Sequence, residues 1–243
     1  RYQEETSELV DLAEDFNPIF HIIRKIYEDN KYYHKPERLI VLIRKICNAL
    51  IDKCSNYIFP NVLGKISEDP EKEIERLVET KGIISQFMEA YFKYKDKQPS
   101  QGEENQEANG DDDGWHITRN VIFYRLDAFS DRIGDILNVA KSYFEFKKMS
   151  EKVLGGIRAE SLQQQLKDIF DECTEVIKKF NAPVGEGDKE REFDALDITS
   201  DEFNNRYIVF KDSLKELERK ISAVLTQSFD EAETILGKFK VLD

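Results

Sequence analysis

The chain has 243 residues, of which 35% are charged, and it contains only 11 Gly and 6 Pro. Its formal net charge of −13 at pH 7 argues against nucleic acid and anionic membranes as main partners, because both are polyanions. No apolar run approaches the roughly 18 residues that a membrane-spanning helix needs. The opening RYQEETSEL has neither Met nor a signal-peptide pattern, so we expect a segment of a longer protein.

The first third of the chain predicts long helices. One helix covers about Pro18 to Tyr32, a second begins at Pro36, and a third begins at Pro70 with Asp69 as its N-cap. The apolar face of the second helix consists of Ile43, Cys47, Leu50, Cys54 and Tyr57. The three cysteines, Cys47, Cys54 and Cys173, lack metal-ligand spacing and are interpreted as buried thiols of a reducing compartment.

Residues 97–114, KQPSQGEENQEANGDDDG, interrupt the helical pattern. This stretch has no large apolar side chain, so it cannot bury enough surface to offset the entropy of ordering. We therefore expect an acidic disordered linker here. It divides the chain into an N-terminal helical bundle segment at 1–96, the linker at 97–114, and a C-terminal helical bundle at 115–243.

After residue 115, apolar residues recur at alternating steps of three and four in three successive helices, which keeps one apolar seam on each helix. The predicted fold is all-α, with elongated antiparallel helical bundles and heptad-like seams. A capping box, with Thr199 as N-cap and Glu202 three residues later, is expected to open the last helix. Six seam residues are expected to share one core: Leu126, Ile133, Leu166, Phe210, Leu217 and Ile221.

Two adjacent glycines, Gly155 and Gly156, precede a helical run and raise the question of a phosphate site. A P-loop needs GxxxxGK[ST], whereas Ile157-Arg158-Ala159 follows here, and GxGxxG is also absent. We interpret the pair as a turn with positive φ between two helices; an anion held by Arg158 is the alternative. The histidines, the acidic run at 111–113 and the serines lack the spacing of metal, calcium or nucleophile sites. The sequence therefore predicts no catalytic residue, metal or cofactor.

Several spaced motifs together resemble a known family. The pattern W-x-I-x5-F-x-R-L-D-A-F-x2-R-I-x-D-I begins at Trp115, VLGG follows at 153–156, FDALD at 193–197, and EFNNRY to FKVLD at 202–243. These motifs resemble the tail of dynein heavy chains, although Ala159 stands where that family has a third glycine. The first half, from NPIFHII onward, fits more loosely. The double glycine is more typical of axonemal than of cytoplasmic heavy chains.

The resemblance implies a non-catalytic segment, because the AAA modules and the microtubule-binding stalk of the dynein motor are not in these residues. It implies a helical scaffold in a microtubule motor complex of the cytoskeleton, in the axoneme of a cilium or flagellum. The implied partners are a WD-repeat dynein intermediate chain, light chains and neighbouring heavy-chain tails. Nucleic acid, membrane and direct microtubule binding are not expected.

Two alternatives are a helical rod of a tethering or spectrin-like scaffold and a small enzyme or ligand-binding bundle. A rod would share the seams but not RLDAF, the double glycine and the final motif in this order. A ligand-binding bundle would need polar side chains at the seam positions, which are apolar here. If the segment is a scaffold, aromatic residues off the seams are candidates for its interface, unless they complete the core: Tyr32, Tyr33, Phe92, Tyr124 and Phe146.

Overall fold

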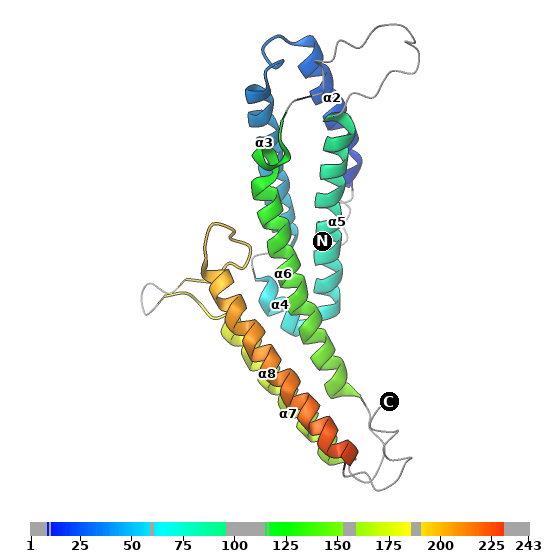
Figure 1. Ribbon diagram of the computed structural model, residues 1–243, viewed down its shortest axis with the longest axis vertical. Helices are drawn as coiled ribbons and strands as arrows, with labels where there is room; N and C mark the ends of the chain where they lie inside the picture. Colours follow the sequence, from blue (N-terminus) through cyan, green and yellow to red (C-terminus); the bar gives the residue numbers. More distant parts are fainter. Residues whose placement is uncertain are drawn as a thin grey trace. The chain divides into compact units, whose positions relative to one another are not determined.

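The computed structural model describes residues 9, 11–58, 61–95, 115, 117–152, 159–185 and 191–230 (Figure 1). The named elements in these ranges are α-helices: α2 (Phe16–Asp29), α3 (Pro36–Ile58), α4 (Val62–Glu68), α5 (Pro70–Lys95), α6 (Arg119–Glu151), α7 (Ala159–Phe180) and α8 (Glu202–Asp230). Across the same ranges, β pairing is limited to one isolated antiparallel bridge between Val184 and Arg191. The all-α helical fold predicted from the sequence is confirmed.

Local signals set several helix ends as the sequence predicts. The helix α3 begins at Pro36 and α5 begins at Pro70, positions where proline needs no backbone N–H partner. Asp69 caps α5, since its Oδ1 accepts a hydrogen bond from the Lys72 backbone N–H at 3.2 Å. The short helix α4 is capped in the same way by Asn61, whose Oδ1 accepts from Gly64 N–H.

The chain folds into two compact units, each of which combines residues from both sides of 97–114. Unit 1 consists of Arg1–Phe59 and Arg76–Gly134, and unit 2 of Pro60–Glu75 and Asp135–Asp243. Two of the three boundaries between the units therefore fall inside helices, in α5 and in α6, and the other falls between α3 and α4. The division expected from the sequence, at 1–96 and 115–243, does not coincide with these units. The expected linker itself lies outside the described residues.

An aromatic cluster forms the core of unit 1. Phe20 of α2 contacts Phe87 of α5, with ring centroids 5.0 Å apart, and Tyr91 packs edge-on against Phe123 of α6 at 4.9 Å. Trp115 is fully buried beside Tyr91, at 5.4 Å. These contacts join residues that precede 97–114 to residues that follow it. Unit 1 therefore includes packed residues from both regions.

In unit 2, α7 and α8 run antiparallel, side by side (Figure 1). The start of α8 lies at the end of α7, where Arg206 binds the Phe180 carbonyl. Further along α8, Lys220 pairs with Glu172, which lies two helical turns before the end of α7. The second part of α6 completes the core, since Tyr143 packs against Phe170 at 5.3 Å. Five residues that the sequence places on the seam of the last helix are buried in α8: Phe203, Phe210, Leu214, Leu217 and Ile221.

The expected single core of six seam residues is wrong in one respect. Leu126 and Ile133 are fully buried, but they belong to unit 1, whereas Leu166 and Leu217 are buried in unit 2. The reason is the length of α6, which has 33 residues and supplies its first half to one unit and its second half to the other.

Candidate interaction surface

The structure places the sequence-predicted site residues in different surroundings. Tyr32, Phe92 and Tyr124 are exposed, with 52%, 36% and 54% of their surface accessible. Tyr33 is partly buried. Phe146 is only 5% exposed, so it belongs to the interior of unit 2, the alternative considered for each of these rings. Gly155 and Gly156, the predicted turn, lie outside the described residues.

Tyr124 lies on a face of unit 1 formed by α3 and α6. The guanidinium of Arg44, on α3, lies 5.3 Å from the centre of the Tyr124 ring, and its Nε donates to the Val121 carbonyl at 2.8 Å. On the same face, Arg125 donates to Asn48 Oδ1 at 3.0 Å. The first contact places the exposed Tyr124 ring beside Arg44, one helical turn from exposed Val121. Tyrosine and arginine are the residues that most often dominate protein interfaces, because both offer large contact area and hydrogen bonds.

Phe92 lies at the edge of the aromatic cluster of unit 1. Its ring is 5.3 Å from Tyr91 and 6.3 Å from Phe123, so one side of the ring is packed and the other faces solvent. A ring held in this way loses little side-chain entropy on binding a partner. Phe92 is thus suited both to complete the core and to contact another protein.

The third exposed ring, Tyr32, lies in the turn between α2 and α3. The guanidinium of Arg38 lies 4.3 Å from the centre of the Tyr32 ring and donates a hydrogen bond to its hydroxyl group. Tyr33 packs edge-on against Tyr32 at 5.1 Å. The turn therefore presents two tyrosines and an arginine as one ordered group.

Unit 2 also exposes apolar residues, on the outer face of α8. Ile208 and Val209 are exposed, at 56% and 65%, next to buried Phe210. They were not predicted as interface residues, because only aromatic residues were candidates. Two adjacent branched residues outside the repeating seam were the signal that could have identified them.

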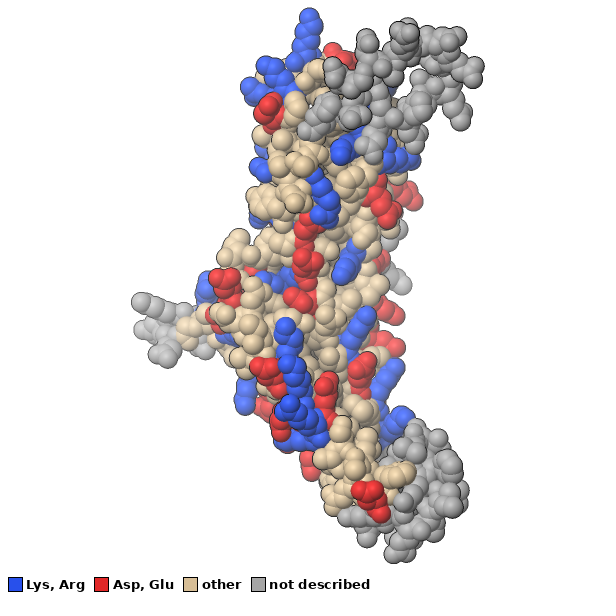
Figure 2. Space-filling model, viewed as in Figure 1, with Lys and Arg blue, Asp and Glu red and all other residues tan. Residues whose placement is uncertain are grey.

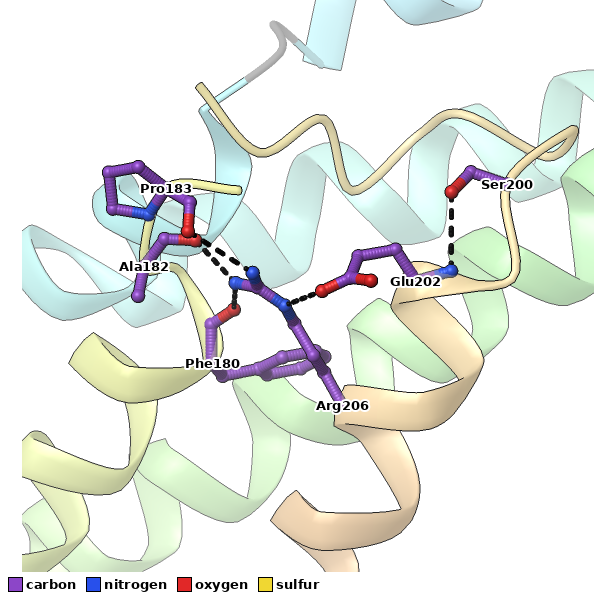
Figure 3. Close-up of polar contacts among 6 residues, drawn as sticks. All are labelled: Phe180, Ala182, Pro183, Ser200, Glu202 and Arg206. Carbon is purple, nitrogen blue, oxygen red and sulfur yellow. Dashed lines mark hydrogen bonds and ion pairs between the residues drawn. The ribbon is translucent and has the colours of Figure 1, made fainter. Parts of the chain in front are cut away.

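Arg206 fixes the start of α8 against the end of α7 (Figure 3). Its Nε donates to Glu202 at 2.7 Å, and Nη1 donates to the carbonyl of Phe180, the last residue of α7, at 2.9 Å. The same guanidinium donates to the carbonyls of Ala182 and Pro183 and lies over the Phe193 ring at 4.4 Å. The last carbonyls of a helix lack intrahelical donors and carry partial negative charge, so a guanidinium satisfies both needs.

The predicted capping box of α8 is wrong, and local hydrogen bonds explain why. Thr199 donates its hydroxyl to Asp197 Oδ1 at 2.6 Å instead of accepting from the helix. Ser200 Oγ accepts from the Glu202 backbone N–H at 3.2 Å (Figure 3). The Glu202 carboxylate, which a capping box would turn back to the N-cap, instead pairs with Arg206.

In unit 1, an arginine also binds the carbonyls at the end of a helix, as Arg206 does in unit 2. Arg24 of α2 donates from Nη1 to the Tyr94 carbonyl at 2.8 Å and to the Lys95 carbonyl at 3.4 Å, at the end of α5. Its Nε pairs with Glu28 at 2.6 Å, one helical turn away, as Arg206 pairs with Glu202. Each unit thus contains a helix whose last carbonyls are bound by an arginine oriented by a glutamate. Neither arginine was predicted as a helix cap from the sequence.

The buried thiols do not form a reactive site. Cys47, Cys54 and Cys173 are free and buried, as predicted. Burial raises the pKa of each thiol to about 12, so each stays protonated at neutral pH and is a poor nucleophile. Within the described ranges, no three His, Cys, Asp or Glu side chains are placed to hold a metal ion. The helices of these ranges are also too short or too polar to cross a membrane.

One open hollow of about 470 Å³ lies along α7 in unit 2. Its lining comes from α7 alone and is mostly charged, including Asp168, Glu172, Glu175 and Lys178. Lys178 and Glu175 pair with each other at 2.6 Å on the solvent side. Side chains of one exposed helix face explain this hollow, and it offers no support for the ligand-binding alternative.

The described residues therefore define an all-α protein with several ordered aromatic and apolar residues on its surface. Over residues 1–243, the chain matches the family model of the dynein heavy chain, N-terminal region 1. The chain belongs to this family. The match disfavours the spectrin-like rod that the sequence left open.

Three relatives illustrate the similarity. The chain is 28% identical over 236 residues to the ciliary dynein beta chain of Tripneustes gratilla and 28% identical over 235 residues to the flagellar outer arm dynein beta chain of Chlamydomonas reinhardtii. It is 26% identical over 240 residues to human dynein axonemal heavy chain 9. These alignments cover 97 to 98% of this chain but 5% of each relative, so the chain spans a small part of their length.

Proposed function

We propose that this segment is a non-catalytic part of a dynein heavy-chain tail and serves as a helical scaffold for assembly. Its partners are a WD-repeat intermediate chain, light chains and the tails of neighbouring heavy chains. The family membership supports the place in a heavy chain. The assembly role rests on one observation: Tyr32, Phe92 and Tyr124 are ordered by neighbouring residues yet remain exposed.

An exposed tyrosine or phenylalanine that becomes buried at an interface contributes through its apolar area, at about 25 cal/mol per Å². Rings whose positions are already fixed by Arg44, Arg38 or Tyr91 lose little entropy when they bind. Such residues commonly supply most of the affinity of a protein interface.

The scaffold role also includes the absence of catalysis. In dynein heavy chains the catalytic AAA modules lie outside the N-terminal region, so ATP hydrolysis belongs to another part of the protein. The net charge of −13 opposes direct binding to the acidic surface of a microtubule, as well as to nucleic acid or an anionic membrane. The ciliary and flagellar relatives favour the axoneme as its location.

A capture experiment with a purified axonemal dynein intermediate chain tests the proposal. Tyr124→Glu and Phe92→Glu place a charge on the exposed rings, and each is expected to reduce capture of the chain at least about tenfold. Gln86→Glu, an exposed polar position on α5 in the same unit, is the matched control and is expected to bind normally. Circular dichroism checks that helical content is unchanged.

Normal capture of both Tyr124→Glu and Phe92→Glu would show that these two rings do not contact the intermediate chain. ATP hydrolysis by the purified chain, or binding to bare microtubules that resists salt, would contradict the scaffold role itself.

A further inference from the structure

The turn between α2 and α3 is held in one conformation by its own hydrogen bonds. Asn30 Oδ1 accepts from the Tyr32 backbone N–H at 2.9 Å, and the Asn30 carbonyl accepts from the His34 N–H at 3.0 Å. His34 Nδ1 donates to the Tyr27 carbonyl at 2.9 Å, and its ring stacks on the Tyr27 ring at 4.6 Å. These bonds fix the backbone on which Tyr32 is displayed.

The side chains of this turn are ordered as well as exposed. Tyr32 is 52% exposed, Tyr33 packs edge-on against it, and Arg38 covers one face of its ring at 4.3 Å. The contact with Tyr32 orients the planar guanidinium of Arg38, a group that pairs with carboxylates through two parallel hydrogen bonds. A guanidinium oriented in advance loses less entropy when it binds an anion.

The charge of this turn is opposite to that of the chain. Residues 31–38 contain three cations, Lys31, Lys35 and Arg38, and one acidic residue, Glu37, in a chain with a net charge of −13. Among the described residues, no ion pair engages these three cations. Figure 2 shows Lys and Arg side chains at this end of unit 1, with a few Asp and Glu side chains beside them. The turn is thus a local site for negative charge.

We propose that the α2–α3 turn, residues 30–38, binds an acidic peptide segment of a partner protein. One carboxylate of the peptide pairs with Arg38, and neighbouring carboxylates pair with Lys31 and Lys35. An apolar side chain of the peptide packs on Tyr32 and Tyr33. This inference rests on the proposed scaffold function and names the chemistry of one partner. A short peptide fits better than nucleic acid or a membrane, because an extended polyanion would also have to cover the acidic surface elsewhere on the chain.

The test measures fluorescence anisotropy of a labelled decapeptide of glutamate with one central tryptophan, titrated with the 243-residue chain. We expect saturable binding that weakens as salt is raised, since exposed charges are screened. Arg38→Glu and Lys35→Glu are each expected to weaken binding at least about tenfold, and Tyr32→Ala severalfold. Two separate charge reversals at exposed positions keep the test valid if one of them disturbs folding.

Lys211→Glu is the matched control. Lys211 also lies over a tyrosine ring, with its Nζ 4.6 Å from the centre of Tyr207, but it belongs to α8 in unit 2. It should leave peptide binding unchanged. Equal losses for Lys211→Glu and Arg38→Glu would overturn the proposal, because they would indicate a response to overall charge. Tighter binding of a labelled single-stranded DNA, or of phosphatidylserine vesicles, than of the peptide would also overturn it.

The intermediate-chain capture experiment separates this inference from the scaffold function. If the peptide does not bind but capture still depends on Tyr124, the acidic-peptide site is wrong and the scaffold function stands. If the peptide binds in the expected way but no intermediate chain is captured, the scaffold function fails and the turn remains a peptide site.

Discussion

Arg206 and Glu202 face each other across one turn of α8, with 2.7 Å between Nε and Oε1, and this pairing aims the rest of the guanidinium at the carbonyl of Phe180, the last residue of α7. Glu202 thus orients an arginine whose main partner is the end of another helix. The pair is partly buried, with 17% of the Arg206 side chain and 35% of the Glu202 side chain exposed. Its effect on stability should therefore exceed that of a surface ion pair.

Replacing Arg206 by Met should lower the free energy of unfolding by about 1–3 kcal/mol, because it leaves the last carbonyl of α7 and two carbonyls just beyond it without a charged donor. Urea denaturation followed by circular dichroism measures the change. Arg219→Met is the control, since Arg219 pairs with Glu216 at 3.2 Å with 76% of its side chain exposed. That variant should stay within about 0.5 kcal/mol of the parent chain. Equal effects of the two substitutions would show that the cap on α7 contributes nothing.

Leu217 lies on the buried seam of α8, at 3% exposure. Leu217→Ala should cost roughly 2–5 kcal/mol of unfolding free energy, because it removes buried methyl groups and leaves a cavity. Val209→Ala, on the exposed side of the same helix, should cost far less. The two melting temperatures give the comparison, and an unchanged value for Leu217→Ala would contradict the burial of this seam.

A specific protease site placed within residues 103–113 tests how unit 1 is built. Because Tyr91 packs on Phe123 and Trp115, the two fragments should stay associated after cleavage and elute together from a size-exclusion column. Tyr91→Ala should favour their separation. Separate packing of residues 1–96 and 115–243, the division expected from the sequence, requires instead that the cleaved fragments of the parent chain separate.

The buried thiols give the stability a defined dependence on pH. In the unfolded chain each thiol has the ordinary value of 9.0, and burial raises the pKa of Cys173 to about 12 in the folded state. The folded state therefore keeps a proton that the unfolded state has lost, and this contribution to stability is complete below pH 9 and declines between about pH 9 and 12. The decline approaches 1.4 kcal/mol per pH unit for each thiol.

Urea denaturation of the parent chain and of Cys173→Ala across this range measures the contribution. The variant should have the shallower slope between pH 9 and 12 and the same slope as the parent below pH 9. Identical slopes over the whole range would mean that Cys173 ionises as readily in the folded chain as in the unfolded one.

The sequence predicted the helices well because their signals are local. The burial of Ile43, Leu50, Phe210 and Leu217 follows from steps of three and four residues, and Pro36 determines a helix start by itself. Phe146 is buried three residues after the seam residue Tyr143, so the same periodicity could have removed it from the candidate surface. These successes need only neighbours in the chain.

The arginine caps could not be predicted in this way, because their partners are backbone carbonyls far along the chain. Arg206 acts 26 residues from Phe180 and Arg24 acts 70 residues from Tyr94, and a carbonyl leaves no mark in the sequence. The two compact units escaped prediction for a related reason. A continuous helix such as α6 shows one uninterrupted seam, although its two halves belong to different cores.

Unit 2 combines two segments that are far apart in the sequence, and this has a consequence for synthesis on the ribosome. Val62, Leu63 and Ile66 of α4 are fully buried, and they belong to the first segment of unit 2, Pro60–Glu75, whereas its second segment begins at Asp135. At the usual rate of about 5–20 residues per second, several seconds pass before the second segment emerges. During that interval the apolar side of α4 is without its final neighbours, so the nascent chain offers a binding site for chaperones that the finished unit conceals.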